Sequence, residues 1–273
     1  MILLDNISIA QGSETIIKQI STLLEAGKVH VIIGPNGTGK STLLRTLFGD
    51  LPLQAGQIIW QEKKLLPGAS TGKVLQQWRK EISYMPQDTG LDISLSVLEV
   101  VVLGGLDNLT LHIDPSLLEQ AMDCLHAAGM AELAHRDIGQ LSGGQRQMVL
   151  FAQVLMRNAA MLLLDEPVSA LDLHHQIAML DRVREQTHRR NLVTVIVLHD
   201  LNLACQYADN LLIFSHGQLQ ASGSPLEIIS PELLSKTYGV ELEILYDRGG
   251  FPLIQPLSRH HPLATIKTTR NTL

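Results

Sequence analysis

The 273-residue sequence predicts an α/β fold organised around a parallel sheet, and two observations support this prediction. A short apolar run rich in β-branched residues, 29–33, leads into a glycine-rich segment that ends in Gly-Lys-Ser-Thr. A later apolar run, 161–164, ends in the acidic pair Asp165 and Glu166. Both runs are typical of buried central strands, and both deliver polar groups at the edge where ligands of an open parallel sheet lie.

The glycine-rich segment fits the phosphate-binding pattern of Gly, four residues and then Gly-Lys-Ser/Thr. Glycines let backbone N–H groups curl around phosphate oxygens, and the helix that starts near Lys40 directs its positive end toward them. The Lys40 charge would lie near the β and γ phosphates, and the Ser41 hydroxyl would bind magnesium. Strand, motif and helix in register favour a nucleotide site over an incidental turn, and that site comprises Gly34, Pro35, Asn36, Gly37, Thr38, Gly39, Lys40, Ser41 and Thr42.

The two carboxylates of the acidic pair can have different roles. Asp165 would help to hold the hydration shell of magnesium, and Glu166 would polarise the attacking water as a general base. An acidic pair after a strand is often only a solvated loop. The phosphate-binding segment elsewhere in the chain favours the functional interpretation.

The pentapeptide Leu-Ser-Gly-Gly-Gln at 141–145 predicts a helix N-terminus with Ser142 as the N-cap. A helix that opens with Ser-Gly-Gly exposes free N–H groups and a dipole end, which together form an anion site. Since the chain already has one phosphate cradle, we expect this second one to serve a nucleotide held by another subunit.

With these motifs in this order, the chain resembles the nucleotide-binding subunit of an ATP-binding-cassette transporter over nearly its whole length. The resemblance implies a P-loop NTPase (RecA-like) core with an N-terminal antiparallel β subdomain and an inserted helical subdomain. It also implies ATP and Mg²⁺ as ligands, and a head-to-tail homodimer. Each ATP would lie between the phosphate loop of one subunit and the signature helix of the other.

Further residues match motifs of the family. Gln87 matches the glutamine that joins the magnesium shell while its loop senses the membrane subunit, and Asp172 ends the segment matching the D-loop. His199 matches the switch histidine, which would bind the γ-phosphate and the attacking water. The resemblance assigns catalysis to Lys40, Glu166 and His199, magnesium to Ser41, Gln87 and Asp165, and ATP contacts to Gln87, Ser142, Gly143, Gly144, Gln145 and Asp172.

The first 87 residues read as strands around one helix. Apolar and polar residues alternate over 2–20 around Gly12, which predicts an antiparallel hairpin. The core strand and the phosphate-loop helix follow. Residues 51–80 predict a turn, the strand 58–60 and a polar stretch, and 82–85 predict another short strand.

The middle of the chain, about 88–157, predicts a mainly helical subdomain with the signature at one end and Gln87 at the other. A rigid unit of this kind would link the γ-phosphate contact to the partner-sensing loop. Its candidate helices are 96–103, 115–128 and 143–157.

The last third returns to alternating elements. We expect helices at 173–190, 201–207 and 225–238 with a break at Pro231, a strand at 193–198, and hairpins of 211–214 with 218–222 and 243–246 with 251–254. The expected ATPase domain is 1–257, with a core of 1–87 and 158–257, and a polar, frayed tail follows at 258–273.

Composition argues against other classes of protein. A net charge of −6 with 18% charged residues disfavours a nucleic-acid binder. No apolar run is long enough to span a bilayer, and the start lacks the features of a signal peptide. Any membrane association is therefore expected to be through a partner, and the resemblance implies a peripheral protein on the cytoplasmic face of the inner membrane. Cys124 and Cys205 are expected to be buried free thiols, and the histidine pairs 174–175 and 260–261 lack metal-site spacing.

The transported substrate is less constrained. The stretches 198–204, 171–176 and 238–256 resemble ATPases of ferric-siderophore, heme and cobalamin importers. We expect iron-siderophore import, with heme or cobalamin as alternatives, through polytopic permease subunits and, indirectly, a substrate-binding protein. A soluble ATPase that acts as a regulatory or interaction module without a permease is the alternative of another class.

One departure from the family concerns the base. Family members often stack an aromatic residue on adenine just before a glycine of the first hairpin, where this chain has Ala10, Gln11 and Gly12. Stacking on a base is worth on the order of 1–3 kcal/mol in single-stranded nucleic-acid complexes. We therefore expect weak discrimination of adenine and tolerance of GTP.

Overall fold

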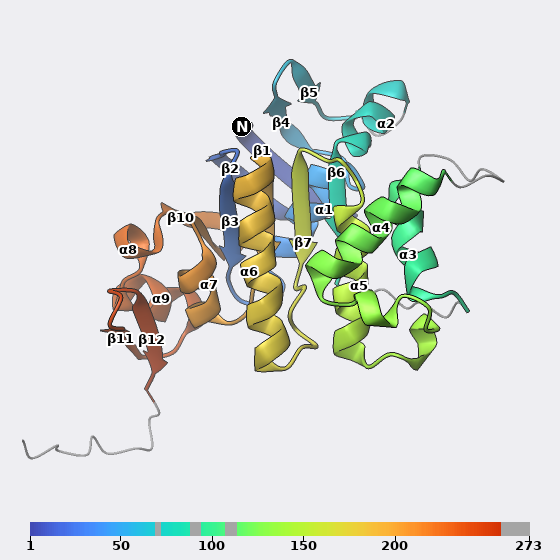
Figure 1. The fold of residues 1–273 in the computed structure, drawn as a ribbon. Coiled ribbons are helices and arrows are strands. Elements are labelled where there is room, and N and C mark those ends of the chain that lie inside the picture. Colours follow the sequence, from blue (N-terminus) through green and yellow to red (C-terminus); the bar gives the residue numbers. More distant parts are fainter. Residues whose placement is uncertain (69–71, 88–93, 107–113, 258–273) are drawn as a thin grey trace, which may run out of the picture.

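The computed structural model describes residues 1–68, 72–87, 94–106 and 114–257. Its centre is a six-stranded sheet in which five strands run parallel and one edge strand is antiparallel (Figure 1). The buried apolar runs of the sequence form its inner strands, as predicted. In spatial order the strands are β10 (Gln218–Gly223), β9 (Asn210–Ser215), β3 (Lys28–Ile33), β8 (Val193–Val197), β7 (Met161–Asp165) and β6 (Ile82–Met85).

A second, antiparallel sheet contains the N-terminal strands. Its order is β2 (Glu14–Leu24), β1 (Ile2–Gln11), β4 (Ala55–Trp60) and β5 (Lys63–Leu65). The predicted hairpin is confirmed, although its second strand runs four residues beyond the predicted end at Ile20. Helix α1 (Lys40–Phe48) packs between the two sheets, because the buried leucines on α1 belong to a core cluster shared with both.

The helical block contains α3 (Val97–Gly105), α4 (Pro115–Ala128) and α5 (Gly143–Leu155), with short 3₁₀ turns at Ala131–Leu133 and Ile138–Gln140. It lies beside the six-stranded sheet (Figure 1). All three predicted helices are present within about two residues, and Ser96 and Ser142 cap two of them with reciprocal side-chain bonds. The predicted helical character of 88–93 and 107–113 lies outside the described residues.

The C-terminal helices and the last hairpin pack on the same face of the six-stranded sheet as the helical block, because their buried apolar side chains belong to one core cluster. The predicted break at Pro231 separates two helices, and the last hairpin is a sheet of its own. The predicted tail, 258–273, lies outside the described residues. The elements are α6 (Leu173–Arg190), α7 (Leu201–Tyr207), α8 (Pro225–Ile228), α9 (Pro231–Tyr238), β11 (Leu242–Tyr246) and β12 (Pro252–Pro256).

The polar stretch predicted before residue 80 contains a strand and a helix that the sequence analysis did not assign. Residues 63–65 pair with β4, and Lys73–Lys80 form helix α2. Only Leu75 and Trp78 of α2 are buried, one helical turn apart, and the Trp78 indole donates a hydrogen bond of 2.8 Å to the Leu47 carbonyl oxygen. Tertiary anchoring of two side chains, rather than a long apolar period, stabilises this helix.

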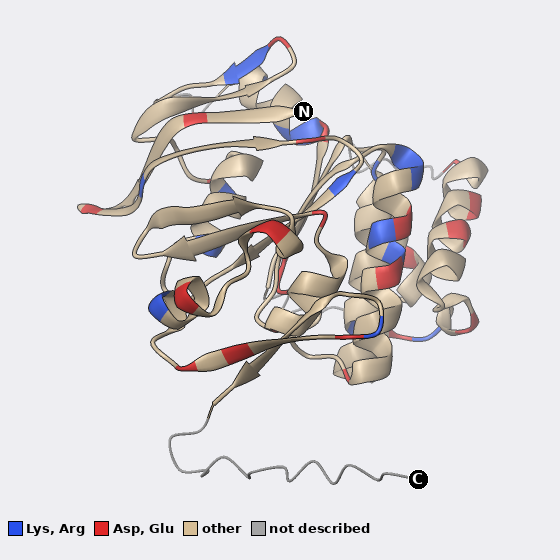
Figure 2. Ribbon diagram, turned by 90° about the vertical axis from the view of Figure 1, so that its left-hand side faces the viewer, with Lys and Arg blue, Asp and Glu red and all other residues tan. Residues whose placement is uncertain are grey.

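The two cysteines lie in helices as free thiols, but only one is fully buried. Cys205 on α7 is buried, and burial raises the pKa of its thiol to about 12. Cys124 on α4 is half-buried, which corrects the expectation that both would be inaccessible. Among the described residues no helix is both long and apolar enough to cross a membrane. Acidic and basic residues lie interspersed on the ribbon in Figure 2.

Candidate functional site

Four neighbouring parallel strands bring the predicted site residues together. The strands β3, β8, β7 and β6 are adjacent in the sheet, and their carboxyl ends lie at one edge. The phosphate-binding segment follows β3, His199 follows β8, Glu166 follows β7 and Gln87 follows β6. Residues far apart in the chain therefore meet around one pocket.

Two glycines set the path of the phosphate-binding segment. Gly34 has a φ of 150°, and a Cβ atom there would lie 2.2 Å from the carbonyl oxygen of Phe214 on β9. Gly39 has a φ of 96° and is the N-cap of α1, with no side-chain hydrogen bond to the first turn. The first N–H groups of α1 thus remain available to an anion.

Lys40 is held against the same segment. The residue is only 5% exposed, and its Nζ donates hydrogen bonds of 2.8 Å to the carbonyl oxygens of Gly34 and Pro35. Burial lowers the pKa of the ammonium group, and the nearby carboxylates of Glu166 and Asp165 oppose this effect. A phosphate would give this cation a full negative partner in place of two carbonyl groups.

Ser41 and Asp165 form the part of the site that suits a magnesium ion. The Ser41 hydroxyl donates to Asp165 Oδ1 at 3.0 Å, and Asp165 is 3% exposed. Burial raises the pKa of this carboxyl group. The described residues contain no cluster of three or more His, Cys, Asp or Glu that could hold a metal. One carboxylate beside one hydroxyl matches Mg²⁺, which usually binds through few protein oxygens together with substrate phosphates.

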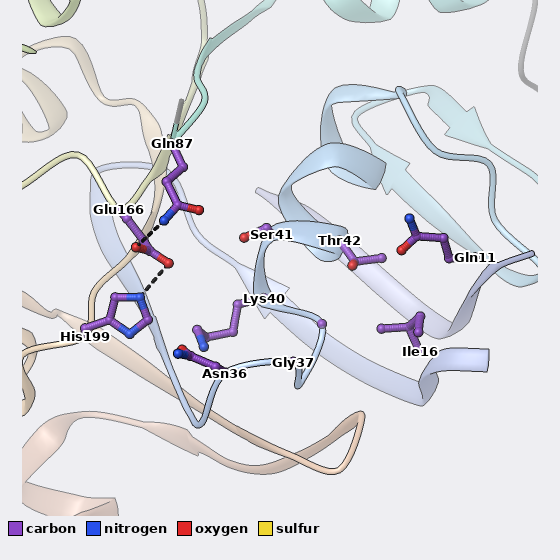
Figure 3. A pocket seen from close by; sticks show the side chains of 11 residues that line it. Gln11, Ile16, Asn36, Gly37, Lys40, Ser41, Thr42, Gln87, Glu166 and His199 are labelled. Atoms are coloured by element: carbon purple, nitrogen blue, oxygen red, sulfur yellow. Dashed lines mark hydrogen bonds and ion pairs between the residues drawn. The ribbon is translucent and has the colours of Figure 1, made fainter. Parts of the chain in front are cut away.

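Glu166 lies at the centre of a hydrogen-bonded trio (Figure 3). Its Oε2 accepts from Gln87 Nε2 at 2.8 Å, and its Oε1 lies 2.5 Å from His199 Nε2. Its backbone has a φ of 50°, in the left-handed region that non-glycine residues uncommonly occupy. Both carboxylate oxygens are therefore engaged, and the Gln87 amide nitrogen faces Glu166.

The pocket extends from this trio, past Lys40, to the turn of the first hairpin (Figure 3). It has a volume of about 510 Å³. At the end away from Glu166 it is lined by Gln11 and Ile16, and no Phe, Tyr or Trp is among the described residues that line it. The full lining is Gln11, Ile16, Asn36, Gly37, Gly39, Lys40, Ser41, Thr42, Gln87, Glu166 and His199.

Ile16 was not among the predicted site residues. The pairing of β1 with β2 shifts between Ile9–Ile17 and Ala10–Thr15, so Ile16 is an extra residue without a cross-strand partner. Such a bulge redirects a side chain, here into the pocket and against Gly39. The adjacent apolar pair at 16 and 17, which breaks the alternation, was the available sequence signal.

The signature residues do not line this pocket. Ser142 is the N-cap of α5, its Oγ accepts from the Gln145 amide at 3.2 Å, and Gln145 Oε1 accepts from the Ser142 amide. Gly143 is exposed, Gly144 is half-buried, and Asp172 caps the start of α6 through the His175 amide. Within one chain, the second anion site therefore lies apart from the phosphate-binding segment.

Comparisons with known proteins agree with this geometry. A family model described as "ABC transporter" matches residues 17–169. The hemin import ATP-binding protein HmuV of Thermobifida fusca is 34% identical over 253 residues, covering 92% of this chain and 87% of that protein. The ferric enterobactin transport ATP-binding protein FepC of Escherichia coli is 34% identical over 264 residues, covering 94% of each chain.

Solved structures with the same fold include an inward-facing conformation of a putative metal-chelate type ABC transporter. The alignment has a TM-score of 0.80 and 25% identity, and it covers 94% of this chain and 98% of that one. The ATP-binding cassette MJ1267 aligns with a TM-score of 0.77 at 25% identity, over 88% of this chain and 97% of that one. The architecture is thus that of a P-loop NTPase cassette, as predicted.

Proposed function

Because this chain belongs to the ABC transporter family and is an ATPase that powers transport, we propose that it drives the import of chelated iron. The HmuV protein of Thermobifida fusca, named for hemin, and the FepC protein of Escherichia coli, named for ferric enterobactin, are each 34% identical to this chain. Both cargoes are iron held in an organic chelator. Iron-siderophore import is the expectation from the sequence, and hemin import has equal support. Cobalamin import is the remaining alternative.

The observation that carries the proposed site is the placement of Lys40, Glu166 and His199 around one pocket. Lys40 would exchange the carbonyl oxygens of Gly34 and Pro35 for the β- and γ-phosphate oxygens of ATP. The backbone N–H groups from Gly37 into the start of α1 would hold the same phosphates. Neither step requires the segment to fold anew.

Magnesium would be held by Ser41 and Asp165, with Gln87 as a further ligand after its amide turns from Glu166. When bound, the ion neutralises charge that develops on the β- and γ-phosphate oxygens. The present bond between Ser41 and Asp165 already sets the hydroxyl and the carboxylate at one point of the pocket wall. Positioning of these oxygens is the contribution of the chain.

Glu166 is the proposed general base, and its two oxygens are both engaged before nucleotide binds. A base can take a proton from water only if one oxygen is free to accept it. We therefore expect ATP binding to draw His199 toward the γ-phosphate and Gln87 toward the magnesium site. Both movements release Glu166 toward the attacking water.

The completed site needs a second copy of the chain. The start of α5 supplies the free N–H groups of Gly143 and Gly144 and the Ser142 hydroxyl. Asp172, the N-cap of α6, supplies a carboxylate. We propose that these groups close on an ATP bound to the phosphate loop of the partner subunit. This arrangement yields a head-to-tail homodimer with two composite sites.

The membrane partner would bind on the helical block. The α3–α4 region has an apolar groove of about 200 Å³, lined mainly by aliphatic side chains that include Leu98, Val102, Leu103, Leu106 and Leu118, with Glu99 at one side. Exposed leucines at 103 and 118 suit burial against a permease segment. Attachment through this groove and the Gln87 loop would make the chain peripheral on the cytoplasmic face of the membrane, with the substrate-binding protein as an indirect partner.

Mutation of the proposed base is the test of the mechanism. Glu166→Gln keeps the size of the side chain but removes the proton acceptor, so ATP turnover should fall at least about a hundredfold. The variant should accumulate as an ATP-bound dimer, visible by size-exclusion chromatography with Mg-ATP. Turnover close to the wild-type rate would exclude Glu166 as the base.

A second measurement separates the importer from the module without a permease. We expect the chain to co-purify with a polytopic membrane protein, and Leu103→Asp to abolish this association while ATP turnover of the isolated chain is unchanged. A stable free dimer that recovers no membrane protein would favour the regulatory module. Uptake of ferric siderophore against hemin, in cells that contain the recovered permease, then identifies the cargo.

A further inference from the structure

The side chain of Asn202, in the first turn of α7, is bonded to the β11–β12 hairpin. Its Oδ1 accepts a hydrogen bond of 2.7 Å from the Ile254 amide, and its Nδ2 donates to the Ile254 carbonyl oxygen at 3.5 Å. One amide side chain thus pairs with both backbone polar groups of a β12 residue. The two partners come from 198–204 and 238–256, two of the stretches that resemble chelate importers.

The two ends of α7 are fastened differently. At the C-terminal end, the Tyr207 hydroxyl donates to Asp181 on α6 at 2.8 Å, and Asp209 accepts from the Val29 amide of β3 at 2.8 Å. At the N-terminal end, Asp200 bonds only to amides of the same turn. Among the hydrogen bonds of the described residues, the Asn202 side chain makes those that join this first turn to another element.

His199 lies between two anchors of the backbone. On one side, the Leu198 amide donates to the Ile32 carbonyl oxygen at 3.2 Å, which fixes the end of β8 against β3. On the other side is the turn that Asn202 fastens. The His199 ring is 42% exposed and has Glu166 as its recorded partner, so neighbouring side chains hold it only in part. The backbone is thus hydrogen-bonded to other elements on both sides of His199, at Leu198 and through Asn202.

We propose that Asn202 is a positioning residue for His199, acting through the start of α7 with the β11–β12 hairpin as its support. An isolated two-stranded hairpin is marginally stable in water. Here Leu242 and Ile254 are buried in the same cluster as Leu203 and Ala204 of α7, so the hairpin is a fixed support. The stretches 198–204 and 238–256 would therefore act together to position His199.

This inference rests on the proposed role of His199 in ATP hydrolysis. A displacement of about 1 Å in a catalytic group can cost on the order of a hundredfold in rate. Loss of the Asn202 bonds should therefore lower kcat about tenfold or more. The KM for ATP should change less than about threefold, because the phosphate-binding segment is untouched.

The test compares three variants of the full chain with wild type. Asn202→Ala removes both bonds at an exposed helical position, whereas Asn202→Asp keeps an oxygen that accepts from the Ile254 amide. Gln255→Ala alters the next residue of β12, whose exposed side chain donates to the Pro256 carbonyl oxygen and, among the described residues, has no bond to α7. We expect a low kcat for Asn202→Ala alone, with the other two within about threefold of wild type.

Hydrogen exchange of the Ile254 amide is the readout that does not depend on catalysis. The amide should be protected in wild type and in Asn202→Asp, and should exchange faster in Asn202→Ala. If the Ile254 amide were unprotected in wild type, the Asn202 side chain would not hold the hairpin in solution, and this result would overturn the proposal even if Asn202→Ala failed to fold. Equal kcat in wild type and a folded Asn202→Ala would overturn the positioning role. A protected amide together with full turnover in a His199→Ala variant would instead contradict the function proposed for His199.

Discussion

The two helix N-termini that the sequence marks as anion sites, those of α1 and α5, differ in how far the chain completes them. The N-cap of α1 is Gly39, which has no side chain to bond the first turn, and groups from four strands surround it. The N-cap of α5 is Ser142, which forms a capping box with Gln145, and it lies apart from that pocket. The α1 end lies in a pocket with most of the predicted catalytic groups. At the α5 end, the Ser142 and Gln145 side chains already bond to two of the helix's backbone amides.

The difference shows what the capping box leaves for a ligand. Ser142 Oγ accepts from the Gln145 amide, so its lone pair is used while its hydrogen remains free. A hydroxyl held in this way can donate to a phosphate oxygen without losing its cap. The α1 end instead keeps its N–H groups free and holds its cation, Lys40, on carbonyl oxygens. In the proposed head-to-tail dimer, the two ends would therefore be complementary parts of one composite site rather than two equivalent sites.

The largest expected effects come from mutating each helix end separately, which tests whether both ends are needed for ATP hydrolysis. Lys40→Ala should reduce ATP turnover at least about a hundredfold, because the buried charge that meets the β and γ phosphates is lost. Ser142→Asp should reduce turnover to a similar extent, because aspartate still caps the helix but presents a carboxylate to the γ-phosphate. Steady-state ATPase assays of each purified variant measure both effects.

Mixing the two inactive chains distinguishes a composite site from a site within one chain. In a head-to-tail heterodimer, one site combines an intact phosphate loop with an intact α5, and the other contains both defects. Random pairing should therefore restore about a quarter of wild-type activity, half of the dimers having one good site of two. A mixture as inactive as its components would show that each chain hydrolyses ATP without the partner's α5, or that both sites must be intact together.

Much of the α1 site could be predicted from the sequence because its parts are contiguous. Strand, loop and helix follow one another from Lys28 to Phe48, and the acidic pair lies at the carboxyl end of β7, with Asp165 as its last residue. The capping of α5 was also predictable, since a serine followed three residues later by glutamine is a local signal. Each of these features depends on neighbours in the chain.

The missed features depend on contacts between distant segments. Helix α2 is held by Trp78 bonding to Leu47, and Ile16 enters the pocket through a shift in register with β1. The hydrogen bond between Asn202 and Ile254 joins residues 52 positions apart. Neither hydrophobic period nor residue type encodes the pairing of Trp78 with Leu47 or of Asn202 with Ile254. For Ile16, the break in alternation at 16 and 17 indicates a bulge but not the pocket that the side chain enters.

The end of the α1 pocket that would hold the nucleotide base gives the next largest expected effect, a change in nucleotide affinity. It offers Gln11 and Ile16 and no aromatic side chain, so wild type should hydrolyse GTP at a rate comparable to ATP. Gln11→Tyr would add a stacking surface worth about 1–3 kcal/mol for a base, so nucleotide KM should fall about fivefold or more. Competition assays with ATP and GTP on both proteins measure this change.

Gln11→Leu is the matched control, because it removes the amide without adding a ring and should leave KM nearly unchanged. An ATP preference of several orders of magnitude in wild type would contradict weak recognition of the base. Equal KM values for Gln11→Tyr and wild type would show that the base lies elsewhere in the pocket. The α5 end should be unaffected in both variants, since its proposed contact is with phosphate rather than with the nucleotide base.

The smallest expected effect is on stability, and it separates the two helix ends without any nucleotide. Ser142→Ala removes the side-chain cap of α5 and should lower the free energy of unfolding by about 1 kcal/mol. Ser142→Asp should stay close to wild type, because aspartate is an equally good N-cap and a carboxylate near a helix N-terminus is favourable. Urea denaturation of the nucleotide-free proteins, followed by circular dichroism, measures both values. If Ser142→Ala were as stable as wild type, the capping box would not hold Ser142 in solution, and its hydroxyl would need ATP to become ordered.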